Sequence, residues 1–145
     1  MPEPPISEPV VLLAEDNQDD VLLVRRAFER AGLKNQIHIV QNGLEAIAYL
    51  NGDGLFEDRE KYPLPDLVLL DLRMPKADGL EVLGWIRHQW EFLHLCVVML
   101  TSCDEIHKVN QAYALGANSF LVKPLDFVNA AELMHSLHIV LAREV

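Results

Sequence analysis

The sequence predicts a doubly wound α/β domain built on a five-stranded parallel sheet, and two observations support this fold class. Short apolar runs without polar alternation recur along the chain, which is typical of strands buried on both faces of a parallel sheet. Segments with helical spacing of their apolar residues follow these runs, so that a strand-then-helix unit occurs five times. That alternation indicates helices on both faces of the sheet, joined by right-handed crossovers.

Predicted strands and helices alternate along the chain. The strands are the short apolar segments 10–14, 36–40, 67–70, 95–100 and 119–122. The helices begin near capping residues and carry an apolar stripe; they are 20–31, 43–50, 80–90, a fourth that Ser102 or Asp104 caps and that runs to about Leu115, and a last one after Asp126. Asn17 or Asp19 is expected to cap the first helix, and Gly32 is expected to end it. Residues 51–65 are rich in Gly, Pro and acids, and predict a long exposed loop that could serve as a contact surface.

Composition limits the domain organisation and the partners. A proline-rich leader over residues 1–9 is expected to be disordered, and residues 10–145 to form one domain. The net charge of −10 argues against nucleic acid or an anionic membrane surface as main partner, and fits cations and protein partners. No apolar run reaches the roughly 18 residues of a membrane span. Cys96 and Cys103 match no C-x-x-C spacing, so a reduced, cytoplasmic protein is expected.

Four of the five predicted strands end at residues that can do chemistry. These residues are Glu15 and Asp16, then Asp71, then Thr101, then Lys123. Because the carboxyl ends of parallel strands share one edge of the sheet, these side chains are expected to converge. Two carboxylates about 4 Å apart repel by roughly 4 kcal/mol at an effective dielectric near 20, so the cluster must raise a pKa or hold a divalent cation. Oxygen ligands without His or Cys favour Mg²⁺, with Mn²⁺ as a substitute.

Asp71 is the expected reactive group of this cluster. A cation, a lysine and a threonine hydroxyl around one carboxylate would hold the three oxygens of a phosphoryl group. A carboxylate that is already ionised at neutral pH can attack phosphorus without a general base. The sequence therefore predicts an acyl phosphate on Asp71, and a simple capping role for this residue is the competing interpretation.

The sequence resembles the receiver domains of two-component response regulators over about residues 10–142. The resemblance rests on residue pairs in the family's order: Glu15-Asp16, Asp71 with Met74-Pro75 and Asp78-Gly79, Thr101-Ser102 and Lys123-Pro124. It implies the flavodoxin-like (βα)5 fold with strand order 2-1-3-4-5, the order for which a protein of this family is a standard example. The 51–65 loop is similar to that of single-domain regulators paired with bacterial or cyanobacterial phytochrome-type kinases.

The resemblance also implies how the acidic residues act. Asp71 would accept a phosphoryl group from a sensor histidine kinase. Asp16 and Asp71 would bind Mg²⁺ directly, Glu15 would bind it through water, and Arg73 would offer its backbone carbonyl. Arg73 and Cys103 stand where other members carry groups that orient a hydrolytic water, so slow self-dephosphorylation is expected.

The remaining implied roles concern the phosphoryl oxygens and the response. Thr101 and Lys123 would bind these oxygens, with support from Ser102. Thr101 would then swing inward together with Phe120, which would reshape the surface of the fourth helix, last strand and last helix.

The expected output is a contact with another protein. The chain ends shortly after Lys123, so no output domain is expected, and the signal would pass to a phosphotransfer protein, to the kinase or to a twin subunit. Homodimerisation through the last two helices is a hypothesis. Two other functions stay open: a receiver-like binding scaffold without phosphoryl turnover, and an Asp-nucleophile phosphohydrolase. The hydrolase would want a second Asp two residues after Asp71, where this sequence has Arg73.

Overall fold

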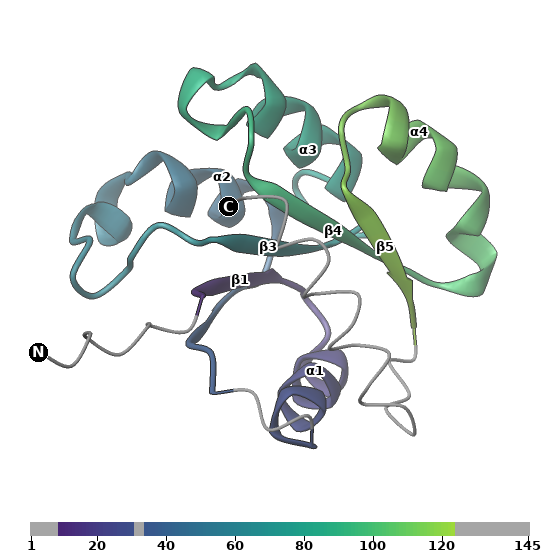
Figure 1. Ribbon diagram of the computed structural model, residues 1–145, viewed down its shortest axis with the longest axis horizontal. Helices are drawn as coiled ribbons and strands as arrows, with labels where there is room; N and C mark the ends of the chain where they lie inside the picture. Colours follow the sequence, from purple (N-terminus) through teal and green to yellow (C-terminus); the bar gives the residue numbers. More distant parts are fainter. Residues whose placement is uncertain (1–8, 31–33, 124–145) are drawn as a thin grey trace, which may run out of the picture.

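Five parallel strands form the centre of the protein in the computed structural model, which describes residues 9–30 and 34–123 (Figure 1). The strands are β1 (Val11–Ala14), β2 (Ile37–Val40), β3 (Leu67–Asp71), β4 (Cys96–Thr101) and β5 (Ser119–Val122). Their order is β2-β1-β3-β4-β5, and every neighbouring pair is parallel. The predicted fold class and strand order are confirmed.

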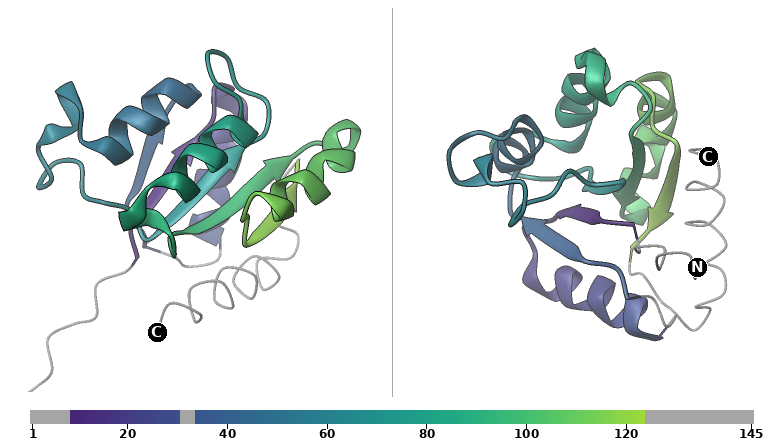
Figure 2. Two further views of the ribbon diagram at one scale, coloured as in Figure 1. Left: turned by 90° about the horizontal axis from the view of Figure 1, so that it is seen from above. Right: turned by 60° about the vertical axis from the view of Figure 1, so that its left-hand side comes forward.

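Helices cover both faces of this sheet. They are α1 (Gln18–Arg30), α2 (Gly43–Asn51), α3 (Gly79–His88) and α4 (Val109–Ala114). Figures 1 and 2 show α1 on one face, with α2, α3 and α4 on the other. Alternate residues of each strand face opposite sides, so the apolar runs supply two cores. Leu13 and Leu69 pack with Val24 and Phe28 under α1, and a second cluster lies under α2 and α3.

Side-chain caps account for the starts of α1, α2 and α3. Asn17 caps α1, because its Oδ1 accepts hydrogen bonds from the backbone N–H groups of Asp19 (2.9 Å) and Asp20 (3.2 Å). Asn42 and Asp78 accept equivalent bonds at α2 and α3, each 2.9 Å long. The helix expected over 80–90 ends at His88 and is followed by a short 3-10 helix, Trp90–Phe92. Several predicted features lie outside the described residues: the leader 1–8, the stop at Gly32, Pro124 and the helix after Asp126.

The predicted helix, capped by Ser102 or Asp104 and running to about Leu115, is wrong in its first half. The chain forms a 3-10 helix, η3 (Cys103–Lys108), before α4 begins at Val109. The physical reason lies outside the segment. The buried carboxylate of Glu105 is held by the guanidinium of Arg73, which belongs to the loop after β3, and by Lys108. This tertiary contact stabilises the tighter turn.

Residues 51–65 are exposed along much of their length, as predicted, but they are anchored to α2. A 3-10 helix, Gly54–Glu57, follows α2 directly. Phe56 and Tyr62 pack against the buried ring of Tyr49, with ring centroids 5.1 and 6.0 Å away, and Tyr49 Oη donates to the Pro63 carbonyl at 2.8 Å. Arg59 donates to three backbone carbonyls, those of Tyr49 (2.8 Å), Leu50 (2.9 Å) and Tyr62 (3.2 Å). The loop therefore closes the carboxyl end of α2, where helix carbonyls otherwise lack partners.

Replacing Arg59 with Met is expected to lower the free energy of unfolding by about 2 kcal/mol, because a charged donor to several carbonyls is lost while the aliphatic stem is kept. Urea denaturation measures this change. Lys61→Met is the matched control: Lys61 belongs to the same loop and lies over the Tyr62 ring, 5.5 Å from its centroid. We expect the control to cost less than about 1 kcal/mol. Equal losses in the two variants would contradict the capping role of Arg59.

Among the described helices, none combines the length and the apolar character that crossing a membrane requires.

Candidate functional site

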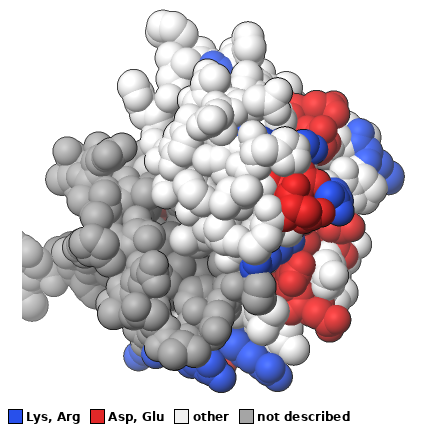
Figure 3. Space-filling model, turned by 90° about the vertical axis from the view of Figure 1, so that its right-hand side faces the viewer, with Lys and Arg blue, Asp and Glu red and all other residues white. Residues whose placement is uncertain are grey.

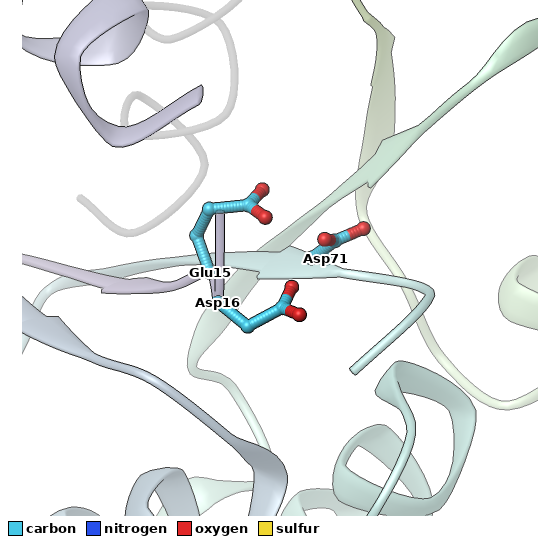
Figure 4. Close-up of side chains that lie close together, drawn as sticks. All are labelled: Glu15, Asp16 and Asp71. Carbon is cyan, nitrogen blue, oxygen red and sulfur yellow. The ribbon is translucent and has the colours of Figure 1, made fainter. Parts of the chain in front are cut away.

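Three carboxylates meet at the carboxyl edge of the sheet. Glu15 and Asp16 directly follow β1, and Asp71 is the last residue of β3, the strand beside it. One oxygen from each lies within 4.8 Å of the others, and Figure 4 shows the three side chains converging. Glu15 and Asp71 are buried, whereas Asp16 is exposed. They open onto a pocket of about 300 Å³ whose polar lining also includes Asn17, Asp20, Arg73, Ser102, Glu105 and Lys123.

Lys123 supplies the positive charge of this pocket. It follows β5, and its Nζ lies 2.5 Å from Glu15 Oε2, 2.9 Å from Asp71 Oδ2 and 3.0 Å from Asp20 Oδ2. The backbone N–H of Lys123 also donates to the Thr101 carbonyl at 2.6 Å, which ties the residue to the end of β4. One ammonium thus connects three carboxylates, two from the junction of β1 and α1 and one from the end of β3.

Burial and close charges shift the pKa values of this group. Burial, together with a hydrogen bond to Asp71, raises the pKa of Glu15 to about 8, although Lys123 opposes this shift. Burial by itself lowers the pKa of the Lys123 ammonium, but its hydrogen bonds to Glu15 and Asp71 outweigh this effect and raise the pKa above its ordinary value. Lys123 therefore stays charged at neutral pH. The raised pKa of Glu15 therefore reflects its burial first and the neighbouring Asp71 carboxyl second.

The donor set fits a hard divalent cation. Three carboxylates within reach of one point, in a pocket that water can enter, are the oxygen ligands that Mg²⁺ prefers. A divalent charge there would favour the ionised form of Glu15. The backbone of Arg73 adjoins this point, since its N–H donates to Asp71 Oδ1 at 3.2 Å.

The side chain of Arg73 turns away from the three carboxylates and toward η3. Its Nε donates to Glu105 Oε1 at 2.7 Å, its Nη2 pairs with the same oxygen, and Nη2 also donates to Asp104 Oδ2 at 3.3 Å. Lys108 binds the other Glu105 oxygen at 3.0 Å. Hydrogen bonds from Lys108 and Arg73 hold the pKa of Glu105 below its usual range. The loop after β3 is thus linked to the loop after β4 at the rim of the pocket.

Of the predicted residues Thr101, Ser102 and Phe120, Ser102 lines the pocket, whereas Thr101 and Phe120 are not among its lining residues. Thr101 is buried at the end of β4, and its hydroxyl donates to the Ser102 carbonyl at 3.2 Å. The Ser102 hydroxyl donates to Asp104 Oδ1 at 2.5 Å. Phe120 is half-buried on β5 and meets Tyr113 of α4 edge-on, with centroids 6.2 Å apart. The roles of Thr101 and Phe120 in a switch stay predictions.

Sequence reasoning missed two charged residues of the pocket, Asp20 and Glu105. Asp20 stands four residues after Asp16, in the first turn of α1, and the spacing could have placed it near the same edge. Glu105 has no such signal. Its partner Arg73 is 32 residues away, and only the adjacency of β3 and β4 brings the two together.

Figure 3 shows Asp, Glu, Lys and Arg gathered at one side of the face that carries α4 and β5, next to a broad area without these residue types. The sequence explains the difference. From Val109 to Val122, which includes α4 and β5, there is no Asp, Glu, Lys or Arg. The exposed residues of α4 and its carboxyl end include Tyr113 and Leu115. The surface of α4 and β5 is therefore uncharged.

Comparison with known proteins gives a consistent family assignment. The family profile described as response regulator receiver domain matches residues 11–137. Response regulator Rcp1 of Synechocystis sp. is 36% identical over 128 residues, which cover 88% of this chain and 85% of Rcp1. The structure of Rcp1 in its Mn²⁺-bound form aligns with a TM-score of 0.74 and 32% identity, covering 90% of this chain and 91% of that one.

Two further solved structures are similar over most of the chain. The bacteriophytochrome response regulator RtBRR is 39% identical with a TM-score of 0.78, covering 90% of this chain and 78% of that one. The phosphorylated cyanobacterial phytochrome response regulator RcpA is 30% identical with a TM-score of 0.74, covering 95% of this chain and 92% of that one.

Proposed function

Because the chain belongs to the response regulator receiver domain family, we propose that it accepts a phosphoryl group on Asp71 from a sensor histidine kinase. The observation that carries this proposal is the pocket at the end of β3, where Asp71 is flanked by two carboxylates and bound by Lys123. We propose that residues 10–145 form the receiver domain and that residues 1–9 are a leader.

The proposed step is a transfer between a nitrogen and an oxygen. An Asp71 carboxylate oxygen attacks the phosphorus of a phosphohistidine, an O–P bond forms and the N–P bond breaks. The electron pair of the broken bond stays on the imidazole nitrogen, and the product is an acyl phosphate. Asp71 is held for this step at both oxygens, since Oδ1 accepts from the Arg73 N–H at 3.2 Å and Oδ2 from Lys123 at 2.9 Å.

Asp16, Asp71 and the Arg73 carbonyl would hold Mg²⁺, or Mn²⁺ in its place, and Glu15 would bind it through water. A bound ion would neutralise negative charge on the phosphoryl oxygens during the transfer of the phosphoryl group. The Mn²⁺-bound form of Rcp1 and the three-carboxylate cluster support this assignment. Self-dephosphorylation is proposed to be slow, because the Arg73 guanidinium is engaged by Glu105 and Asp104.

The phosphoryl oxygens would be bound by Lys123 and by the Thr101 hydroxyl, with Ser102 assisting. Thr101 must leave its bond to the Ser102 carbonyl to do so. We propose that Phe120 follows this movement inward and that the uncharged surface of α4 and β5 changes with it. The last helix, which the family resemblance adds to that surface, lies outside the described residues.

The similarity to RtBRR and RcpA supports a phytochrome-type histidine kinase as the donor. We propose that the signal passes to a phosphotransfer protein, or to a second copy of the chain docked through the last two helices. A cytoplasmic location follows from a kinase donor of this kind.

Incubation with Mg²⁺ and acetyl phosphate tests the function. The protein is expected to gain the mass of one phosphoryl group, and EDTA is expected to prevent this gain. Continuous release of inorganic phosphate without a stable adduct would instead identify a hydrolase. If the protein gains no adduct and releases no phosphate, the proposal is overturned and the binding scaffold is the remaining function.

A further inference from the structure

We propose that Asp20 is a positioning residue that holds the Lys123 ammonium before phosphorylation and gives it up when the phosphoryl group arrives on Asp71. This inference rests on the proposed function and adds a residue to it. Asp20 belongs to the first turn of α1 and lines the same pocket as Asp71.

The Lys123 ammonium has three N–H groups, and three carboxylates surround it. Its Nζ lies 2.5 Å from Glu15 Oε2, 2.9 Å from Asp71 Oδ2 and 3.0 Å from Asp20 Oδ2. Nζ donates hydrogen bonds to Asp71 Oδ2 and Asp20 Oδ2, and it forms an ion pair with Glu15 Oε2. A phosphoryl oxygen that approaches Lys123 therefore competes with carboxylates that are already bound there, and the like charges favour the departure of one of them.

Burial decides which carboxylate is displaced. The side chain of Glu15 is 0% exposed, that of Asp71 is 8% exposed and that of Asp20 is 26% exposed. A carboxylate that loses its partner inside the protein is costly, whereas one that reaches water can be rehydrated. Asp71 itself becomes the phosphoryl carrier. Asp20 is thus the partner that can leave at least cost, and its oxygen occupies the position at Lys123 that a phosphoryl oxygen would take.

Charge gives this exchange a measurable consequence. The incoming phosphoryl group is negative, and in the wild type it meets the negative Asp20 and a lysine that is already bound. Replacing Asp20 with Asn removes the like charge and leaves Lys123 a neutral acceptor, which a phosphoryl oxygen displaces more easily. The same substitution lowers the total negative charge of the pocket, which weakens cation binding, so the two effects must be separated by saturating Mg²⁺.

The test compares Asp20→Asn with Asp19→Asn at saturating Mg²⁺. Asp19 is the exposed neighbour in the same first turn of α1, so both variants lose one carboxylate near the same helix end. The rate of phosphorylation by acetyl phosphate is expected to rise roughly fivefold in Asp20→Asn, the effect of about 1 kcal/mol from one like charge across water. Asp19→Asn is expected to match the wild type. An Asp20→Asn rate equal to or below that of Asp19→Asn would overturn the proposal.

A second measurement does not depend on phosphorylation. In ¹⁵N-lysine NMR spectra, the ammonium signal of Lys123 is expected to exchange equally slowly in the wild type and in Asp19→Asn, and measurably faster in Asp20→Asn, where a neutral acceptor replaces the carboxylate. An unchanged exchange rate in Asp20→Asn would show that Asp20 does not hold the lysine. If the wild type takes up no phosphoryl group while the NMR result is as expected, the proposed function fails and the contact of Asp20 with Lys123 stands. Normal uptake with no difference between the variants rejects only the role of Asp20.

Discussion

Asp71→Asn protein is expected to take up no phosphoryl group from acetyl phosphate, under conditions in which the wild type takes up one per chain. An amide is a poor nucleophile toward phosphorus, whereas the carboxylate needs no general base. Asn has nearly the same shape, and its carbonyl oxygen can still accept from the Arg73 N–H or from Lys123, which bind the two Asp71 oxygens in the wild type. The fold should therefore survive while the chemistry is lost.

Intact-mass measurement after incubation checks this prediction. Asp66→Asn is the matched control. Asp66 directly precedes β3, whereas Asp71 is the last residue of that strand. Asp66 Oδ2 accepts from the Val10 N–H at 2.8 Å. This contact lies at the amino ends of β1 and β3, whereas the pocket lies at their carboxyl ends. The control is expected to take up phosphoryl normally. Uptake by Asp71→Asn at the wild-type level would mean that another residue is the acceptor.

The second large effect is on stability, where Gly79→Ala is expected to lower the free energy of unfolding by about 3 kcal/mol. A Cβ at Gly79 would lie 2.3 Å from the Asp71 carbonyl oxygen and 2.8 Å from Leu72 Cα. Both are backbone atoms at the end of β3, so the overlap cannot be relieved by a side-chain rotation. The Gly79 N–H also donates to the Leu72 carbonyl at 2.9 Å, and this close approach closes the loop that carries Arg73. Slower phosphorylation is expected as well, because the strain falls on Asp71.

Gly84→Ala provides the matched control, since Gly84 belongs to the same helix and a Cβ there would meet no atom within 4 Å. Ala in an open helix interior is expected to raise stability by about 0.8 kcal/mol. Urea denaturation of the two variants is therefore expected to give changes of opposite sign. A Gly79→Ala protein as stable as Gly84→Ala would show that the loop after β3 can shift freely.

Much of the fold could be predicted because its signals are local. Leu67 to Leu70 are apolar without alternation, and the structure buries them on both faces as β3. The convergence of Glu15, Asp16, Asp71 and Lys123 was predictable as well, since it needs only parallel strands that end at one edge. The family resemblance supplied the strand order, which the apolar pattern by itself does not contain.

The misses share one physical cause, which is a contact between segments distant in sequence. The 3-10 helix at Cys103–Lys108 depends on the pairing of Arg73 with Glu105, and the anchoring of the 51–65 loop depends on Arg59 reaching the carbonyls of α2. Long charged side chains have many accessible partners, and hydrogen-bond energies of about 1 kcal/mol leave no trace in a local pattern.

By itself, the sequence determined which residues enter the core and which chemical groups end each strand, because burial and turn formation act over a few neighbouring residues. Only the tertiary structure decided how the charges pair. It gave Lys123 three carboxylate partners, Asp20 among them, and turned Arg73 toward Glu105. Ion pairing depends on distances of a few ångströms between segments that the sheet brings together, and those distances exist only after the chain has folded.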